Sequence, residues 1–516
     1  MGRRGAVACG HPLTAEVAEE VLLDGGNAYD ALVAAFFVAC VVEPVLASLG
    51  GGGFLLASPE GEKTTLLDFF VQTPARRYSP DELDFEPVRV DFGSTTQEFH
   101  IGLGAAATPG CVKGIFEIHR RLGSLPMREL VAPACRLARS GVELNQEQAF
   151  IFSVVEPIYV SRSTARELFG SEHQPGRVKG EGETLAQPHL AETMETLAIE
   201  GDDLFYRGEI AAAIVKQCQG FGFLTLADLE GYRVEERLPL EVGYRGVKVR
   251  TNPPPSTGGT LIAFGLGLLE SIRPDRKGHQ RSDWLMELAD VMAMTQAARV
   301  ELASQSDSSW PDPLKLLAPE ILARYRDEIA GRRRAFRGTT QITIIDGRGS
   351  VASMTCSNGE GCGEMLPDTG IMMNNMLGEE DLNPHGFHQW RPSERISSMM
   401  APSIAIWPDG QLLAIGSGGS NRIRTAILQV LVNTIDFGLD LEAAIAHPWI
   451  HYEGKVLSVE GGLPSATVDE LLAQFPELRL FPGHNIFFGG THAVIHHKGR
   501  FQAVGDPRRG GAARVV

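Results

Sequence analysis

The chain has 516 residues, 43% of them hydrophobic and 22% charged, which is enough for one very large α/β unit or for two to three domains. Its formal net charge of −17 at pH 7 argues against a nucleic-acid partner, because a binding face for nucleic acid needs clustered Lys and Arg. The longest apolar run, residues 31–42, is stopped by Glu43 and is well short of a bilayer span. We therefore expect no membrane segment.

Seven cysteines are scattered along the chain, odd in number and without a Cys-x-x-Cys pair. This pattern is typical of free thiols in a reducing compartment and indicates no zinc site. The first residues carry no apolar core of signal-peptide length. Together these features predict a cytoplasmic protein.

The first part of the chain predicts packed helices. Residues 13–22 have apolar side chains at helical spacing, Gly25 and Gly26 end this helix, and Asn27 is placed to cap a second one. The second helix is hydrophobic nearly all round, so we expect it in an inner layer. Further helices are expected at 111–122, 127–140, 283–304, 421–437 and 466–474.

Four successive glycines at 50–53 lead into an apolar strand. Such a run indicates either backbone packed on backbone or a bound group that lies against bare peptide. A phosphate cradle is not favoured, because no Gly-Lys-Ser/Thr sequence follows.

Strand patterns dominate after residue 339. Residues 342–345 alternate, 346–349 form a turn and 351–355 run back, so a hairpin would bring Ser353, Thr355 or Ser357 close to Thr339. Many strands with paired helices predict a layered α/β fold with sheets packed face to face. Further strands are expected at 402–407, 411–416, 456–460, 485–488, 491–497 and 501–504.

Two adjacent threonines follow Gly338 and open directly into the first of these strands. A threonine hydroxyl is a poor nucleophile unless a base lies beside it, and cleavage before a threonine frees an α-amine that accepts the hydroxyl proton. The hypothesis is a precursor that breaks its own backbone between Gly338 and Thr339. A Gly-Thr-Thr triplet alone more often begins an edge strand, so other motifs must carry the hypothesis.

Eleven short motifs lie between residues 11 and 508. They are His11-Pro12-Leu13, Gly25-Gly26-Asn27-Ala28-Tyr29-Asp30-Ala31, Val42-Glu43-Pro44, Gly51-Gly52-Gly53-Phe54, Thr108-Pro109-Gly110, the 253–259 loop, Gly338-Thr339-Thr340, Asn374-Asn375, Ser397-Ser398-Met399, Gly418-Gly419-Ser420 and Asp506-Pro507-Arg508. In this order they resemble the γ-glutamyltranspeptidase family. The resemblance implies a four-layer αββα N-terminal-nucleophile hydrolase fold. It also implies self-cleavage into a large subunit, 1–338, and a small subunit, 339–516, which together form one unit.

The resemblance implies a role for each motif near the proposed cut. Thr339 would attack an amide carbonyl to give an acyl-enzyme, and water or an amine would then take the acyl group. The backbone amides of Gly418 and Gly419 would form the oxyanion hole, which bare backbone suits because it approaches an oxyanion closely. Ser357 would stand where the family has a second threonine that orients the nucleophile's amine.

Recognition of the γ-glutamyl group is where the chain departs from the family. Phe70 stands at the position of an arginine that clamps the α-carboxylate, and a phenyl ring does not replace a bidentate arginine contact. The residues that hold the α-amine are replaced by Met376 and, at the later position, Glu379. The family's next asparagine falls on Gly359, or on Asn358 after a one-residue shift.

The substrate's carboxylate would still have partners, because the resemblance assigns hydrogen bonds to it from Ser397 and Ser398. The chemistry needs only the hydroxyl, the amine and the oxyanion donors, so no cofactor or metal is expected. Cys356 and Cys362 flank a loop near the proposed site, but a catalytic cysteine is not favoured without a placed base.

Three functions remain open from the sequence. The preferred one is an amidohydrolase or acylase acting on another small acyl amide, with Phe70 and Met376 lining an apolar pocket. The alternative is a true γ-glutamyl transferase or hydrolase of glutathione-like compounds, with Arg391, Arg395 or Arg422 reaching in to replace the missing clamp. The third, from another class, is a non-processing scaffold or binding protein.

Overall fold

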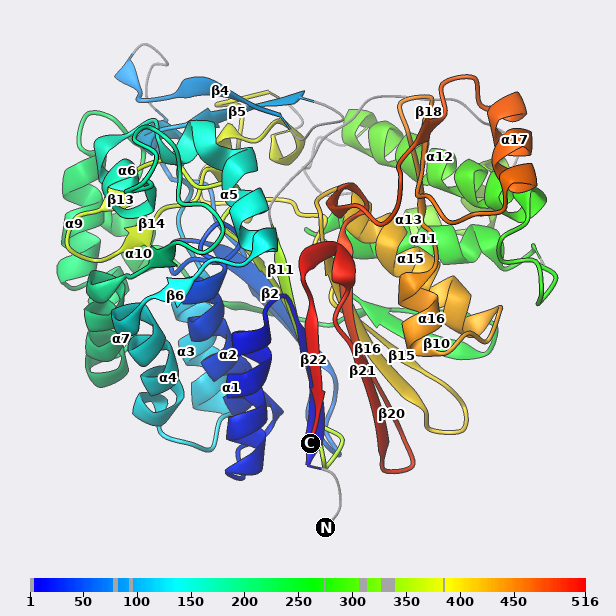
Figure 1. Ribbon diagram of the computed structural model, residues 1–516, viewed down its shortest axis with the longest axis horizontal. Coiled ribbons are helices and arrows are strands. Elements are labelled where there is room, and N and C mark those ends of the chain that lie inside the picture. The colour runs from blue at the N-terminus through cyan, green and yellow to red at the C-terminus, as the bar shows by residue number, and fades with distance from the viewer. Residues whose placement is uncertain are drawn as a thin grey trace.

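The computed structural model describes residues 4–77, 82–91, 96–272, 274–305, 313–325, 339–383 and 386–516. Two β-sheets pack face to face in the middle of the molecule, and helices cover the outer side of each (Figure 1). The predicted four-layer αββα architecture is therefore confirmed. Within the described ranges no helix has the length and apolar character needed to cross a bilayer.

The first sheet has seven strands in the order β22-β1-β11-β12-β2-β3-β8. Its centre is the predicted hairpin, in which Thr340 of β11 pairs with Cys356 of β12. The strands are β1 (Gly5–Cys9), β2 (Gly52–Ser58), β3 (Thr65–Phe69), β8 (Glu235–Arg237), β11 (Thr340–Asp346), β12 (Val351–Ser357) and β22 (Ala512–Val515).

The second sheet has six strands in the order β21-β20-β16-β15-β10-β9, and its central strands lie across from β11 and β12. Its strands are β9 (Leu240–Tyr244), β10 (Val247–Thr251), β15 (Ser403–Ile406), β16 (Leu412–Gly418), β20 (Gly490–His497) and β21 (Arg500–Val504). Strands from before and after residue 339 occur in both sheets. The two predicted subunits are thus interleaved in one structural unit.

Two groups of helices cover the sheets (Figure 1). On the first sheet lie α1 (Pro12–Leu23), α2 (Ala28–Val42), α3 (Cys111–Leu122) and α4 (Met127–Ser140). On the second lie α11 (Thr257–Leu269), α12 (Ser282–Gln305), α15 (Arg422–Ile435) and α16 (Leu441–Ala446).

The second helix forms as its sequence predicts. The Asn27 side chain accepts hydrogen bonds from the Tyr29 and Asp30 amides, and the Asp30 carboxylate accepts the Asn27 amide, which completes a capping box. Every residue of α2 is buried, so the expected inner helix is confirmed.

Smaller elements complete the described part of the fold. They are β4 (Glu86–Asp91), β5 (Thr96–Ile101), η2 (Leu103–Ala105), β6 (Val142–Glu143), α5 (Gln146–Tyr159), α6 (Ser163–Phe169), β7 (Thr184–Leu185), α7 (Pro188–Glu200), α8 (Asp203–Tyr206), α9 (Glu209–Cys218), α10 (Leu226–Gly231), α13 (Pro313–Leu317), α14 (Pro319–Tyr325), β13 (Met365–Leu366), β14 (Ile371–Met372), η3 (Met376–Gly378), η4 (Glu380–Leu382), β17 (Ile450–Glu453), β18 (Val456–Val459), α17 (Ser465–Gln474), β19 (Arg479–Leu480), η5 (Ile486–Phe488) and η6 (Pro507–Arg509).

One expected strand, 485–488, is wrong, because these residues form the 3₁₀ helix η5. The Asn485 side chain accepts the Phe487 amide at 2.9 Å and caps the turn. The rings of Phe487 and Phe488 pack on each other and on Phe481, so apolar side chains that suggested a strand are buried by a turn instead.

The glycine run at 50–53 packs backbone on backbone. A Cβ added to Gly51 would lie 2.4 Å from the carbonyl oxygen of Ser357, and one on Gly52 would lie 2.6 Å from the amide nitrogen of Val71. The first of the two interpretations of this run is therefore right, and the run holds β2 close to the end of β12.

Candidate active site

Thr339 lies directly before β11 and is buried, with 4% of its surface exposed. Gly338, the other residue of the predicted cleavage site, lies outside the described residues. Two positions along, Gln341 projects toward the second sheet, where a Cβ on Gly416 would lie 2.1 Å from its side chain. Because side chains alternate along a strand, Thr339 is on the same face of β11 as Gln341.

A buried hydrogen-bond network lies behind Thr339, between the two sheets. The Gln341 side-chain amide donates to Thr343 Oγ1 at 2.9 Å and Ser353 Oγ at 3.0 Å, and Thr355 Oγ1 donates to Gln341 Oε1 at 2.5 Å. Thr343 Oγ1 in turn donates to the carbonyl of His492 in the second sheet, at 2.9 Å. The network ties β11 to β12 within the first sheet and to β20 in the second.

The hairpin register decides which hydroxyl lies opposite Thr339. Ser353 pairs with Thr343 and Thr355 with Gln341, so the next position along, Ser357, is the one level with Thr339. Of the three hydroxyls expected near Thr339, that of Ser357 thus belongs to the residue level with Thr339 along the hairpin.

The turn after β12 gathers further predicted residues. The Gly359 amide donates to Ser357 Oγ at 3.0 Å, and a Cβ on Gly359 would lie 2.4 Å from a carboxylate oxygen of Glu379. Asn358 is fully buried, and its amide nitrogen and oxygen have no hydrogen-bond partner among the described residues. Buried polar groups are normally paired, so the unpaired side-chain amide makes Asn358 a candidate for contact with a ligand.

Gly418 ends β16 beside Thr339, and Gly419 follows it. A Cβ on Gly418 would lie 2.2 Å from the carbonyl oxygen of Thr339, so only bare backbone fits there. Gly419 has φ +116°, a conformation that glycine adopts without strain. The structure therefore brings the predicted nucleophile and the two predicted oxyanion-hole glycines together.

Arg509 is a member of this site that the sequence did not assign. Its Nη1 donates to the carbonyl oxygen of Thr339 at 3.0 Å, and its Nη2 lies 3.6 Å from a Cβ placed on Gly419. The only sequence signal was its position directly after the Asp506-Pro507-Arg508 motif.

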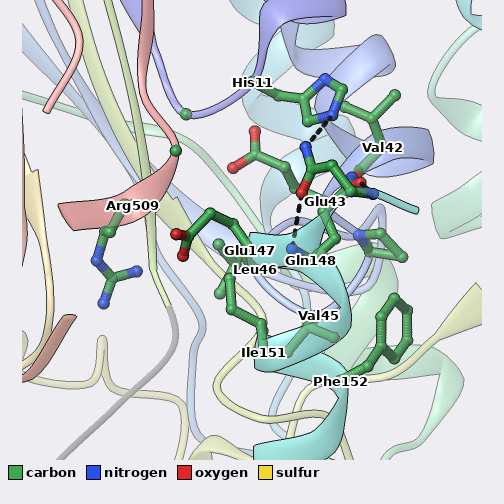
Figure 2. Close-up of a pocket in the computed structure, with 14 residues that line it drawn as sticks. His11, Val42, Glu43, Val45, Leu46, Glu147, Gln148, Ile151, Phe152 and Arg509 are labelled. Carbon is green, nitrogen blue, oxygen red and sulfur yellow. Dashed lines mark hydrogen bonds between the residues drawn. The ribbon is translucent and has the colours of Figure 1, made fainter. Parts of the chain in front are cut away.

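Glu43 is a second unassigned member, located at the C-terminal end of α2. Thr340 Oγ1 donates to its Oε1 at 3.1 Å, and burial raises the pKa of this carboxyl to about 7. Glu43 and Arg509 line the same pocket, together with His11 (Figure 2). Burial lowers the pKa of His11 to about 4, so its imidazole is neutral at pH 7.

Phe70 and Met376 lie in apolar surroundings. The Phe70 ring stacks on Phe54 with 5.3 Å between centroids, and its side chain is 1% exposed. Met376 begins η3, where its amide donates to the side chain of Asn374 at 3.2 Å. Phe70 and Met376 belong to the same hydrophobic core.

The three arginines considered as replacement clamps have other contacts. Arg395 lies 3.2 Å from the Asp68 carboxylate, donates to the carbonyl of Phe70 at 2.6 Å and is buried. Arg422 donates to the carbonyl of Phe487 at 3.0 Å. Arg391 is half exposed and lies 3.9 Å from Glu394.

Ser397 and Ser398 lie against the 253–257 loop, at the start of α11. Ser397 Oγ donates to the carbonyl of Pro255 at 3.0 Å. Ser398 Oγ accepts the Met400 amide at 3.1 Å, and the Ser398 carbonyl accepts the Ser256 hydroxyl at 2.9 Å. The loop therefore fixes both serines, and their contact with substrate stays a prediction.

The cysteines near the site are poor nucleophiles. Burial raises the pKa of the Cys356 thiol, and it raises that of Cys362 to about 12, so both are protonated at neutral pH. Across the described ranges, no three His, Cys, Asp or Glu side chains are arranged to hold a metal ion.

The αββα layers, with an inner strand whose start meets two consecutive glycines, define the fold of N-terminal-nucleophile hydrolases. Residues 14–516 match the family model described as gamma-glutamyltranspeptidase. The chain belongs to the γ-glutamyltranspeptidase family, whose members are amidohydrolases and acyltransferases made as proenzymes.

Known relatives carry different names at the same level of identity. The glutathione hydrolase proenzyme of Bacillus subtilis (strain 168) is 30% identical over 99% of this chain and 92% of its own. The acylase ACY 1 proenzyme of Pseudomonas sp. (strain V22) is 30% identical over 92% of this chain and 87% of its own. The crystal structure of cephalosporin acylase from Bacillus halodurans has the same fold, with a TM-score of 0.86 at 24% identity over 99% and 96% of the two chains.

Proposed function

We propose that Thr339 is the nucleophile of a self-processing amidohydrolase or acyltransferase, freed by cleavage between Gly338 and Thr339. The observation that carries the proposal is the close approach of the Gly418 backbone to the Thr339 carbonyl oxygen, which lies 2.2 Å from a Cβ built on Gly418. Cleavage would give subunits 1–338 and 339–516. They would stay associated, because each contributes strands to both sheets.

In the proposed reaction the α-amine of Thr339 takes the proton from Oγ as Oγ attacks the carbonyl carbon of an amide. The negative charge that develops on the carbonyl oxygen is stabilised by the N–H groups of Gly418 and Gly419. The ammonium then gives its proton to the leaving nitrogen as the C–N bond breaks. Water or an amine attacks the resulting ester, releases the acyl group and returns the proton to Oγ. Ser357 would orient the amine throughout.

For the substrate, we infer a small acyl amide with an apolar acyl chain. The support is that Phe70 and Met376 pack in the apolar core, and that Arg395 is held by Asp68 and backbone carbonyls. Asn358 and Glu379 would contact a polar part of the acyl group, and Ser397 and Ser398 a carboxylate.

Glutathione-like γ-glutamyl compounds are the second candidate substrates. The observation that favours them is the buried carboxylate of Glu379 beside the turn after β12, where an amine would find a partner. Hydrolysis of a γ-glutamyl anilide should be compared with that of pentanoyl and glutaryl anilides, which lack the α-amine. The apolar-acyl proposal requires the highest kcat/KM on one of the latter two, and preference for the γ-glutamyl anilide would overturn it.

Processing is tested by two variants of neighbouring threonines. On a denaturing gel the wild type should split into two fragments, with the smaller beginning at Thr339 by N-terminal sequencing. Thr339→Ala should stay full length and inactive, whereas Thr340→Ala, the matched control, should still split. A wild-type chain that stays whole on incubation would instead favour a scaffold or binding protein.

A further inference from the structure

The buried guanidinium of Arg509 contacts Thr339, the residue that we propose as the nucleophile. Its Nη1 hydrogen-bonds to the Thr339 carbonyl oxygen at 3.0 Å, and its Nε has no hydrogen-bond partner among the described residues. Burial lowers the pKa of this guanidinium, but arginine stays protonated in proteins. A positive charge therefore contacts the residue whose α-amine cleavage at Gly338 would release.

Charged and titratable groups surround Arg509 and Thr339 from several elements. They are Glu43 at the end of α2, Glu147 on α5, Glu360 after β12, His492 on β20, and Asp506 and Arg508 at η6.

These neighbours only partly offset the charge of Arg509. Arg508 lies 3.2 Å from Asp506 and 2.6 Å from Glu460, so it already pairs with the nearest aspartate. Burial raises the pKa of Glu43 to about 7, which leaves it partly neutral at physiological pH. Burial also lowers the pKa of His492 to about 3, so that ring is neutral. Glu360 is the remaining buried carboxyl of the group.

We propose that Arg509 keeps the α-amine of Thr339 unprotonated after cleavage. A free α-amine has a pKa of about 7.7–8.0, so at neutral pH most of it would be ammonium and unable to accept the hydroxyl proton. A like charge nearby disfavours the ammonium form. The inference rests on the proposed role of Thr339, and Arg509 acts through that residue as a positioning residue.

If Arg509 had only a structural role, its removal would change the pH dependence of activity differently from removal of a functional charge. The Arg509 guanidinium also lies against Gly418, so its loss could displace Thr339 from the oxyanion donors. Displacement would lower activity equally at every pH. Loss of the charge would instead raise the pKa of the amine and lower activity only on the acid side.

The test is the pH dependence of kcat/KM for the mature wild type, Arg509→Met and Arg509→Lys. In Arg509→Met the acid limb should move up by about one pH unit, with activity below the limb falling about tenfold and the high-pH plateau largely kept. Arg509→Lys keeps the charge, so its limb should stay near that of the wild type. An Arg509→Met profile lowered evenly, with an unmoved limb, would overturn the proposal.

A second measurement needs no variant, in case Arg509→Met fails to process. Cyanate carbamylates only unprotonated amines, and mass spectrometry of the small subunit's first peptide follows this reaction on the mature wild type. Its midpoint should lie about one unit or more below the ordinary value of about 7.7–8.0. A midpoint at or above that value would overturn the role of Arg509, whereas the absence of any amine at Thr339 would refute the proposed function itself.

Discussion

The two ends of the candidate site are built from different parts of the chain. At the end with the proposed nucleophile, the Gly418 backbone lies against the Thr339 carbonyl, and this approach follows from where β11 begins and β16 ends in the two facing sheets. At the recognition end, Phe70 and Met376 present side chains to an apolar core. Backbone contacts tolerate little change, whereas a side chain at a strand end can be replaced without moving the strand. The same reaction can therefore serve different acyl groups.

The largest effect is expected from Gly418→Ala, because this change disturbs the backbone contact between Gly418 and Thr339. The new Cβ would lie 2.2 Å from the Thr339 carbonyl, so the strand end must shift. Since loss of one oxyanion donor costs about 10²–10³ in kcat, we expect at least that loss of turnover. Gly243→Ala in β9 is the control, because its Cβ would meet nothing within 4 Å. Full activity in Gly418→Ala would contradict this account of the oxyanion hole.

Arg395→Met distinguishes between two roles of Arg395, as a structural residue of the core or as a clamp for the substrate. Breaking one side of a buried ion pair costs about 3–5 kcal/mol when the other charge is left unpaired. Arg237 still pairs with Asp68 at 2.8 Å, so urea unfolding should show a loss at the lower end, about 3 kcal/mol. The half-exposed Arg391, changed to Met, should lose less than about 0.5 kcal/mol. If Arg395 instead grips the substrate, KM would rise with little change in the free energy of unfolding.

Glu43→Gln tests the buried carboxyl that binds Thr340. The pKa of Glu43 is about 7 in the folded protein against an ordinary value of 4.5, so the folded state holds its proton more tightly. The resulting stabilisation is complete below pH 4.5 and is lost as pH rises through 7. Relative to the wild type, Glu43→Gln should gain up to about 3 kcal/mol between pH 4.5 and 7.5 by urea unfolding. A difference that is constant with pH would show that folding does not shift the pKa of Glu43.

The smallest effect is expected at the recognition end, from Phe70→Leu. The swap should cost about 1 kcal/mol of stability and raise KM severalfold for an apolar acyl anilide, because the ring supplies acyl-binding surface. Phe36→Leu, in the fully buried helix α2, should cost similar stability without moving KM. Equal KM values for the two variants would show that Phe70 does not contact the acyl group.

Local signals in the sequence were sufficient for much of the fold. The cap at Asn27 and the all-apolar run behind it predicted α2, and the alternation after Thr339 predicted the hairpin that the register confirms. The edge strand β22 of the first sheet and its neighbour β1 were not expected. They are short, and their pairing joins the two ends of the chain.

The candidate site was predictable only where the family's motifs carry it. Thr340 and Glu43 are 297 positions apart, and Arg509 and Thr339 are 170 apart, so neither contact follows from local pattern. The fate of Arg395 was equally hidden, because its partner Asp68 lies on β3. The sequence gives the residue types, but which of them are in contact depends on how the strands pair and pack in the two sheets.

The most direct test of the central claim is the mass of the small subunit after mixing with substrate and rapid acid quench. We expect a fragment that begins at Thr339 and carries the mass of one acyl group on that residue. An acyl group on another residue such as Cys356, or turnover by an uncleaved chain, would contradict it.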